Sequence, residues 1–291
     1  MILQRVDWLA RAADHAERVD VWTAPHLERR SLGQAHPVHD FLFSYYTQRP
    51  AALRRWHPGF GVELADAPEY DGLKGYQAGT VNADYLASQR PIIESIRTLL
   101  TATASRPPTL GCFGLHEWAM VYRSAPTGDE PANPMRHDWP LRLGPSGTDE
   151  VVESSRIGCS HFDAFRFFTP PARGLNTLQP GRDDRPAFEQ PGCLHAGMDL
   201  YKHAFRLTPM IPSELVADCF ALAWDIRILD MRASPYDFTA LGFAPVPIET
   251  ADGKADYVAA QRTFTERGAP LRQRLIDQCA GLLDVRAKMT P

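Results

Sequence analysis

The stretch SELVADCFALAWDIRILDM, residues 213–231, decides the fold class of this chain. Its apolar side chains recur at helical spacing over about five turns, which predicts one long, largely buried helix. The same periodicity is found before it in residues 194–206 and after it in residues 254–287, where Gly268-Ala269-Pro270 predicts a break. Long helices in this number predict a mainly α protein with several helices.

The first part of the chain is also expected to be helical. Residues 5–22 place Leu, Ala and Val at helical spacing with charged residues between them, which predicts an amphipathic first helix. Asn82 is expected to cap a helix that reaches about Ala104. Pro91 within that segment should kink or divide the helix, because proline lacks a backbone N–H.

The middle of the chain differs in composition. Residues 124–190 are rich in Pro, Gly, Asp and Arg and predict a loop-rich insertion. Two short apolar runs within it, Leu141–Leu143 and Val151–Ile157, predict a small β-ribbon across the turn PSGTDE. No repeat, linker or low-complexity tract marks a boundary, so we expect one globular, helical domain over residues 1–291.

Composition and charge narrow the class of protein. Of 291 residues, 44% are hydrophobic and 23% are charged, which is typical of a globular protein. The net charge of −4 argues against coating nucleic acid through bulk charge but permits a local basic groove. No stretch approaches the ~20 apolar residues of a membrane span. With five cysteines, an odd number that suggests reduced thiols, and an N-terminus charged from Arg5 onward, we expect a cytoplasmic protein.

Three segments share a pattern in which Gly-Cys precedes a histidine: GCFGLHE at 111–117, GCSHFD at 158–163 and GCLHAGMD at 192–199. Thiolate and imidazole are preferred zinc ligands and also suit other transition metals. The segments can therefore build a metal site. The other interpretation is that the cysteines are small buried hydrophobic residues with hydrogen-bonded histidines nearby.

Within the helix predicted over 194–206, His195, Asp199 and His203 fall at positions i, i+4 and i+8. On a helix these positions stay within an arc of about 80°, so the three side chains can face one pocket. A carboxylate beside an imidazole suits either general acid–base catalysis or metal ligation. Alternatively, the three residues lie on the flank of the buried apolar stripe.

Asp225 interrupts the apolar run ALAWDIRIL and is expected to be a buried carboxylate. Such a group needs a partner, and Arg227 or Arg232 can hold it in a structural ion pair. The alternative is a raised pKa that suits proton transfer.

Aromatic and polar residues elsewhere suggest a pocket for a planar ligand. His116-Glu117 precedes Trp118, and His161 with Asp163 precedes an aromatic run that starts at Phe165. Aromatic faces stack on heterocycles, although most aromatic side chains in helical proteins are core residues. The segments 169–186 and 230–237 add polar groups that either line a pocket mouth or pair in a solvated connector. These groups are Arg173, Asn176, Arg182, Arg232 and Tyr236.

The chain resembles an actinobacterial family commonly labelled 3-methyladenine DNA glycosylase. The resemblance covers nearly the whole length. It depends on the segments HPVHDFLFSYY at 36–46, LRRWHPGFG at 53–61, GCFGLHEWAMVYR at 111–123, SHFDAFRFFTPPARGLNTLQP at 160–180, QPGCLHAGMDLYKHAF at 190–205 and DMRASPYD at 230–237.

The resemblance implies a hydrolase of DNA repair that removes alkylation damage. Such an N-glycosylase hydrolyses the glycosidic bond of alkylated adenine after the base is flipped into an aromatic pocket, and it needs no metal or cofactor. The partner would be damaged DNA. The expected catalytic residues are Asp163, Asp199, Asp225, His195 and Glu117, and the expected substrate-binding residues are His116, Trp118, Phe165, Arg173, Asn176, Tyr236 and Arg232.

Two other functions stay open from the residues alone. The first is a metal-dependent enzyme that acts on a small planar or purine-like substrate and binds zinc or iron through His116, His161 and His195. The second is a helical binding protein without catalysis, in which these polar groups would be dispersed. The convergence or separation of the histidines distinguishes the two.

Overall fold

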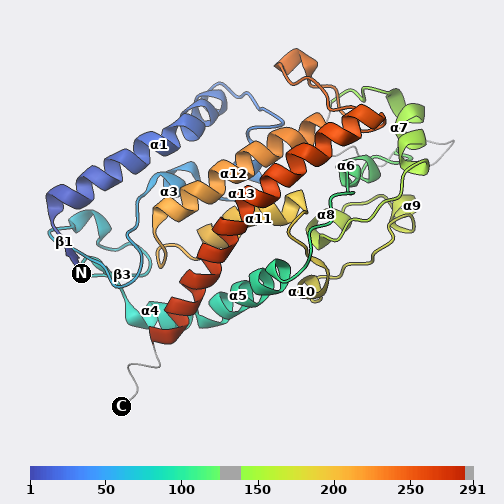
Figure 1. The fold of residues 1–291 in the computed structure, drawn as a ribbon. Helices are drawn as coiled ribbons and strands as arrows, with labels where there is room; N and C mark the ends of the chain where they lie inside the picture. The colour runs from blue at the N-terminus through green and yellow to red at the C-terminus, as the bar shows by residue number, and fades with distance from the viewer. Residues whose placement is uncertain (125–138, 286–291) are drawn as a thin grey trace. The chain divides into compact units, whose positions relative to one another are not determined.

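The structure, a computed structural model, describes residues 1–124 and 139–285. These residues form thirteen α-helices and a small four-stranded sheet (Figure 1). The mainly helical fold class is therefore confirmed. The chain divides into two compact units, with residues 1–101, 198–224 and the chain from 270 on in unit 1, and 102–197 and 225–269 in unit 2. A single domain over 1–291 stays a prediction.

Unit 1 contains the first helix and the sheet. Helix α1 (Arg5–Ser31) follows strand β1 (Ile2–Leu3), and the strands β2 (Glu63–Leu64), β4 (Thr80–Val81) and β3 (Tyr76–Gln77) complete the sheet in that order. Strand β1 pairs parallel with β2, whereas the other two pairings are antiparallel. The amphipathic first helix is confirmed and extends nine residues beyond the predicted end at 22.

An apolar cluster packs α1 of unit 1 onto the segments around the sheet. Trp8 of α1 lies in this cluster with Trp56, Leu64 and Tyr70, and all four are almost completely buried. The Trp8 indole N–H donates a hydrogen bond to the Ala65 carbonyl oxygen at 2.9 Å. Short elements of the same unit are α2 (Phe41–Ser44), α3 (Pro50–Arg54), η1 (Pro68–Tyr70) and α4 (Ala83–Ser88).

The helix predicted to start at Asn82 begins there and is divided. Asn82 Oδ1 accepts hydrogen bonds from the backbone N–H groups of Asp84 and Tyr85, which caps α4. Helix α5 (Arg90–Ala104) then starts one residue before Pro91. A proline in the first helical turn loses no hydrogen bond, so Pro91 starts a new helix here. The predicted cap and division are confirmed.

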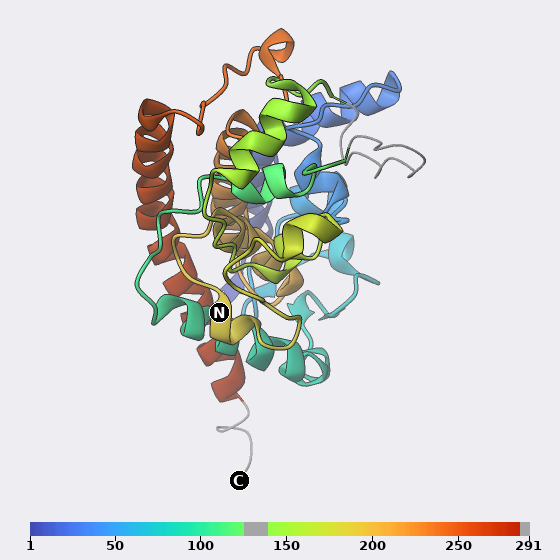
Figure 2. The ribbon, with the colours of Figure 1, turned by 90° about the vertical axis from the view of Figure 1, so that its right-hand side faces the viewer.

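Unit 2 holds the loop-rich middle segment. Its short helices are α6 (Leu115–Ala119), α7 (Gly144–Glu153), α8 (Phe162–Phe165), α9 (Pro170–Arg173) and α10 (Arg185–Phe188), with η2 (Thr239–Leu241) later in the chain. Helices α6 and α7 lie side by side in both ribbon views (Figure 1, Figure 2).

Helix α5 and three further helices contribute residues to both units. The three are α11 (Leu194–Arg206), α12 (Ser213–Arg232) and α13 (Ala251–Asp284). The periodic segments predicted over 194–206 and 213–231 are confirmed. The predicted break at Gly268-Ala269-Pro270 is wrong, since α13 continues through Pro270. A proline inside a helix removes one backbone hydrogen bond and can kink the helix without ending it.

The β-ribbon predicted across PSGTDE is wrong. This segment belongs to α7, in which Pro145 occupies the first turn and the Thr148 hydroxyl donates to the Gly144 carbonyl oxygen at 2.7 Å. Val151 and Val152, expected in a strand, are buried on this helix. A Gly-Pro pair suits a helix start as well as a turn, so the local sequence does not separate the two.

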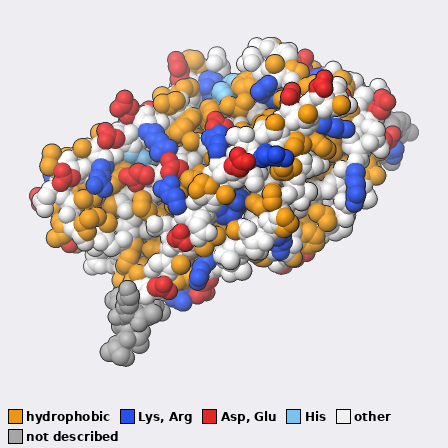
Figure 3. All heavy atoms as spheres, in the orientation of Figure 1, with side chains coloured by type: hydrophobic (Ala, Val, Ile, Leu, Met, Phe, Trp, Pro, Cys, Tyr) orange, Lys and Arg blue, Asp and Glu red, His pale blue; other side chains and the backbone are white. Residues whose placement is uncertain are grey.

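The surface carries charges of both signs. On the face drawn in Figure 3, Lys and Arg side chains are interspersed with Asp and Glu side chains. No helix among the described residues is both long and apolar enough to cross a lipid bilayer, in agreement with the absence of such a segment from the sequence.

Replacing Tyr46 with Phe should destabilise unit 1. The Tyr46 hydroxyl donates to Asp199 Oδ1 at 2.9 Å, and Asp199 is buried. In Tyr46→Phe, Asp199 Oδ1 would lose this hydrogen-bond donor and gain no water in its place. We therefore expect the free energy of unfolding to fall by about 1–3 kcal/mol. Chemical denaturation measures the change. Tyr85→Phe, at a half-buried tyrosine, is the control, and an equal loss in both variants would contradict the prediction.

Candidate metal centre

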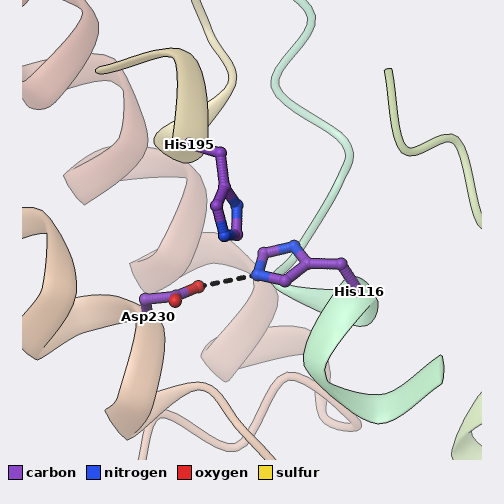
Figure 4. A group of neighbouring side chains, drawn as sticks. All are labelled: His116, His195 and Asp230. Atoms are coloured by element: carbon purple, nitrogen blue, oxygen red, sulfur yellow. Dashed lines mark hydrogen bonds and ion pairs between the residues drawn. The ribbon is translucent and has the colours of Figure 1, made fainter. Parts of the chain in front are cut away.

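Three side chains of unit 2 point toward one another at one buried position (Figure 4). His116 comes from α6, His195 from the first turn of α11 and Asp230 from the last turn of α12. One nitrogen or oxygen atom from each lies within 4.8 Å of those of the other two. Two imidazoles and a carboxylate are a donor set that divalent transition metals bind.

Glycines determine where the two histidine-bearing helices begin. Gly114, directly before α6, has a φ of +69°, a left-handed conformation that glycine adopts without strain. At Gly192, before α11, a Cβ atom would lie 2.6 Å from the Thr109 carbonyl oxygen, so a larger residue does not fit. Each helix then carries its histidine, His116 or His195, at the second position.

A hydrogen bond joins two of the three side chains directly. His116 Nε2 lies 2.9 Å from Asp230 Oδ1. The other carboxylate oxygen, Asp230 Oδ2, accepts a hydrogen bond from Arg227 Nη1 at 3.1 Å, and the same Nη1 lies 3.5 Å from Glu117 Oε1. The side chains of all four residues are at most 3% exposed. Charges of alternating sign therefore lie in contact inside the protein.

The pKa values of the hydrogen-bonded pair move in opposite directions. Burial alone would raise the pKa of Asp230, but the charge of His116 and the hydrogen bond from it hold this pKa well below its usual range. Burial alone would lower the pKa of His116, but the charge of Asp230 and the same hydrogen bond raise it well above its usual value. Without a bound metal, the pair is therefore an imidazolium–carboxylate ion pair at neutral pH.

Cysteine thiols lie beside this group but are not part of it. Cys112 Sγ is 3.8 Å from His116 Nδ1, on the side of the ring away from Asp230. Burial raises the pKa of Cys159 and of Cys193, so both are neutral thiols. Thiols bind metals less well than thiolates. The convergent donor atoms are therefore nitrogen and oxygen.

The third histidine of the Gly-Cys pattern also lies close by. The His161 ring stacks on that of His195 with centroids 5.3 Å apart, and the His195 ring meets that of His116 edge to face at 4.4 Å. His161 Nε2 lies 3.6 Å from Glu189 Oε1, which also accepts a hydrogen bond from Arg185 Nε at 2.6 Å. The three predicted histidine ligands thus form one contiguous cluster.

The other residues expected to be catalytic have various partners. Glu117 is buried and lies next to Arg227 in the charged network described above. Asp163 is partly exposed and lies 3.3 Å from Arg166. Asp199, in unit 1, accepts hydrogen bonds from Tyr46 and Lys202. Their catalytic roles stay predictions.

The expectation of a buried carboxylate at Asp225 is wrong. Its side chain is 45% exposed and pairs with Arg267 at 2.7 Å, and not with Arg227 or Arg232. Asp225 and Asp230 are five residues apart, which places them about 140° apart around the helix. Of the two, Asp230 is completely buried.

Most residues expected to bind substrate contact the protein itself. The Trp118 indole N–H donates to the Ala233 carbonyl oxygen inside the core. The Asn176 side chain accepts a hydrogen bond from the Cys159 backbone N–H and donates one to the Cys159 carbonyl oxygen. His116 is the member of this set that belongs to the buried group. Of the others, Phe165 packs on Phe168, Tyr236 is buried next to Phe238, and Arg173 and Arg232 donate to the backbone oxygens of Arg166 and Ala244.

Three residues in or beside the buried group were not predicted from the sequence to lie there. They are Asp230, Glu189 and Arg227, the last of which was expected to pair with Asp225. A signal for Asp230 exists in the sequence, because it stands between Leu229 and Met231 just as Asp225 stands between Trp224 and Ile226. Its spacing of three from Arg227 also permits a helical ion pair, which the structure contains. Glu189 directly follows α10 and stands four residues after Arg185, a spacing that also permits the ion pair that the structure contains.

The chain matches no protein-family model, no curated protein and no solved structure. The resemblance to glycosylases stays untested.

Asp230→Asn should lower the pKa of His116. With the carboxylate removed, burial dominates and favours the neutral ring. NMR titration of the His116 ring in metal-stripped protein measures this pKa. Asp225→Asn, which removes the same charge from an exposed ion pair, should leave the His116 pKa unchanged.

The same variant should reveal a pH dependence of stability. A histidine whose pKa is raised on folding contributes stability that is complete below its unfolded pKa of about 6.5 and is lost as pH rises through the folded pKa. The excess stability of the wild-type protein over Asp230→Asn should therefore shrink above neutral pH in denaturant titrations. A constant excess at every pH would contradict the ion pair.

Proposed function

We propose that this protein is a metal-dependent enzyme with a mononuclear transition-metal centre held by His116, His195 and Asp230. The convergence of these three donors from three separate helices at one buried position carries the proposal. Zinc and iron are the candidate ions, since both accept imidazole together with carboxylate. Three protein ligands leave at least one coordination position for water or substrate, as catalytic sites require.

The spacing of the donor atoms supports a shared metal. Two ligands at about 2.1 Å from one ion, separated by 90–109°, lie about 3.0–3.4 Å apart. His116 Nε2 and Asp230 Oδ1 are 2.9 Å apart. An ion can thus take the place of the proton between these two atoms without a large movement of either side chain.

Arg227 orients the Asp230 carboxylate for metal binding. By donating to Oδ2 it orients the carboxylate, and it leaves Oδ1, the oxygen beside His116, for the ion. Partners that orient ligands in this way commonly affect metal affinity by about 10–100-fold. A bound metal would polarise a substrate oxygen or lower the pKa of bound water. Because the donors are buried, we expect a small substrate.

Protein purified without chelator should contain about one equivalent of zinc or iron. His116→Gln, His195→Gln and Asp230→Asn each remove a donor atom and should lower metal affinity by more than about 10–100-fold, the loss usual for outer partners. Elemental analysis and competition with a chromophoric chelator measure this. His39→Gln, at a half-buried histidine of unit 1, is the control.

Two results would overturn this proposal. One is wild-type protein that neither contains nor takes up a stoichiometric transition metal. The other is a loss of affinity in His39→Gln as large as in the three ligand variants.

The resemblance to glycosylases carries a separate prediction, hydrolysis of the glycosidic bond of alkylated adenine without a metal. Its test is the release of free base from methylated DNA, measured with and without chelator beside an active glycosylase. Release that persists in chelator would support the glycosylase function, and no release under conditions in which the reference enzyme works would reject it.

A further inference from the structure

His161 is the histidine of the second Gly-Cys segment and occupies the N-cap position of α8 without a capping hydrogen bond from its side chain. It is 1% exposed, and its ring stacks on that of His195 at an interplanar angle of 29°. Its ligand atoms lie outside the group formed by His116, His195 and Asp230, whose donors all lie within 4.8 Å of one another. His161 therefore contacts the ring of one proposed ligand, His195, while its own ligand atoms lie outside the group.

Two of the ring separations are close to those of imidazoles that share one ion. With a metal–nitrogen bond of about 2.1 Å and a ring centroid about 1.1 Å beyond the nitrogen, two imidazoles at 90–109° have centroids about 4.5–5.2 Å apart. The observed separations are 4.4 Å for His116 and His195 and 5.3 Å for His161 and His195. Ligation by His161 would require a rotation of its side chain that brings a ring nitrogen into the group formed by His116, His195 and Asp230.

A carboxylate lies behind His161 in the position typical of metal-ligand histidines. His161 Nε2 faces Glu189 Oε1 at 3.6 Å, and Glu189 is held by Arg185. Histidine ligands commonly donate their second ring N–H to a carboxylate, which sets the tautomer and the ring orientation. Binding through Nδ1 would keep Nε2 directed at Glu189.

We propose that His161 is a fourth protein ligand of the centre, which binds through Nδ1 while its Nε2–H donates to Glu189. This inference rests on the proposed metal-dependent function and narrows it. Each of the three Gly-Cys segments then supplies one imidazole, and α12 supplies the carboxylate of Asp230.

A fourth protein ligand selects among the candidate ions. Four protein donors complete the tetrahedral set that zinc prefers and would make a closed, structural site. Iron(II) and manganese(II) take five or six ligands more readily than zinc, so with either ion an enzyme with this donor set would keep a position for a small substrate. The donors therefore point to iron or manganese and to a substrate small enough to enter a buried site.

Cobalt(II) is a suitable probe, because its d–d spectrum reports coordination and it shifts the NMR signals of its ligands. In the full-length wild-type protein loaded with cobalt(II), we expect three hyperfine-shifted imidazole N–H signals that disappear in D2O, one for each ligand histidine. This measurement needs no variant, so it decides the number of histidine ligands even where a substitution impairs folding.

Variants separate ligation from structural support. His161→Gln should lose one shifted signal, change the d–d spectrum and bind cobalt(II) at least about 10–100-fold more weakly. Glu189→Gln removes the charge behind His161 and should weaken binding about tenfold while all three signals remain. His15→Gln is the matched control, because His15 is a buried histidine of unit 1 that bonds a backbone oxygen.

The outcomes distinguish this inference from the proposed function. Wild-type protein that takes up no cobalt(II) would reject the metal centre itself. Stoichiometric binding with only two shifted N–H signals, or with an unchanged spectrum and affinity in His161→Gln, would leave the centre in place and reject His161 as its ligand.

Discussion

The buried contact between His116 and Asp230 is the constraint around which the candidate site of unit 2 is arranged. It joins α6 to α12 across 114 residues of sequence with neither side chain more than 2% exposed. Removing one partner of a buried ion pair commonly costs about 3–5 kcal/mol, whereas replacing the whole pair with apolar residues is often neutral or stabilising. Stability alone is therefore a weak reason for this pair, and ligand binding is a better one.

Much of the fold follows from the sequence because it is set by local periodicity. The apolar repeat of α12 and the capping side chain of Asn82 are features of neighbouring residues, and the structure contains both. The prediction of a β-ribbon across PSGTDE was wrong because it also depended on local sequence alone. Gly144 and Pro145 suit a helix start as well as a turn. What decides between them is the burial of Val151 and Val152, which depends on distant parts of the chain.

The site was predictable in part. The recurring Gly-Cys-to-His pattern indicated His116, His161 and His195, and these three rings lie in one cluster. The carboxylate was misplaced by five residues. Asp225 and Asp230 have equally apolar neighbours, and the hydrophobic pattern of α12 is too uniform to show which side faces the interior. Only tertiary packing distinguishes the exposed partner of Arg267 from the buried partner of His116.

The net charge around the histidine cluster limits which further ligand a bound ion would take. Two histidines each face a carboxylate that an arginine supports, His116 with Asp230 and Arg227, and His161 with Glu189 and Arg185. With Glu117, three negative and two positive groups give a net charge of −1 when the histidines are neutral. A proton on His116 balances this charge, whereas a divalent ion leaves +1. A buried excess charge is costly, so a divalent ion at the proposed centre would favour an anionic further ligand.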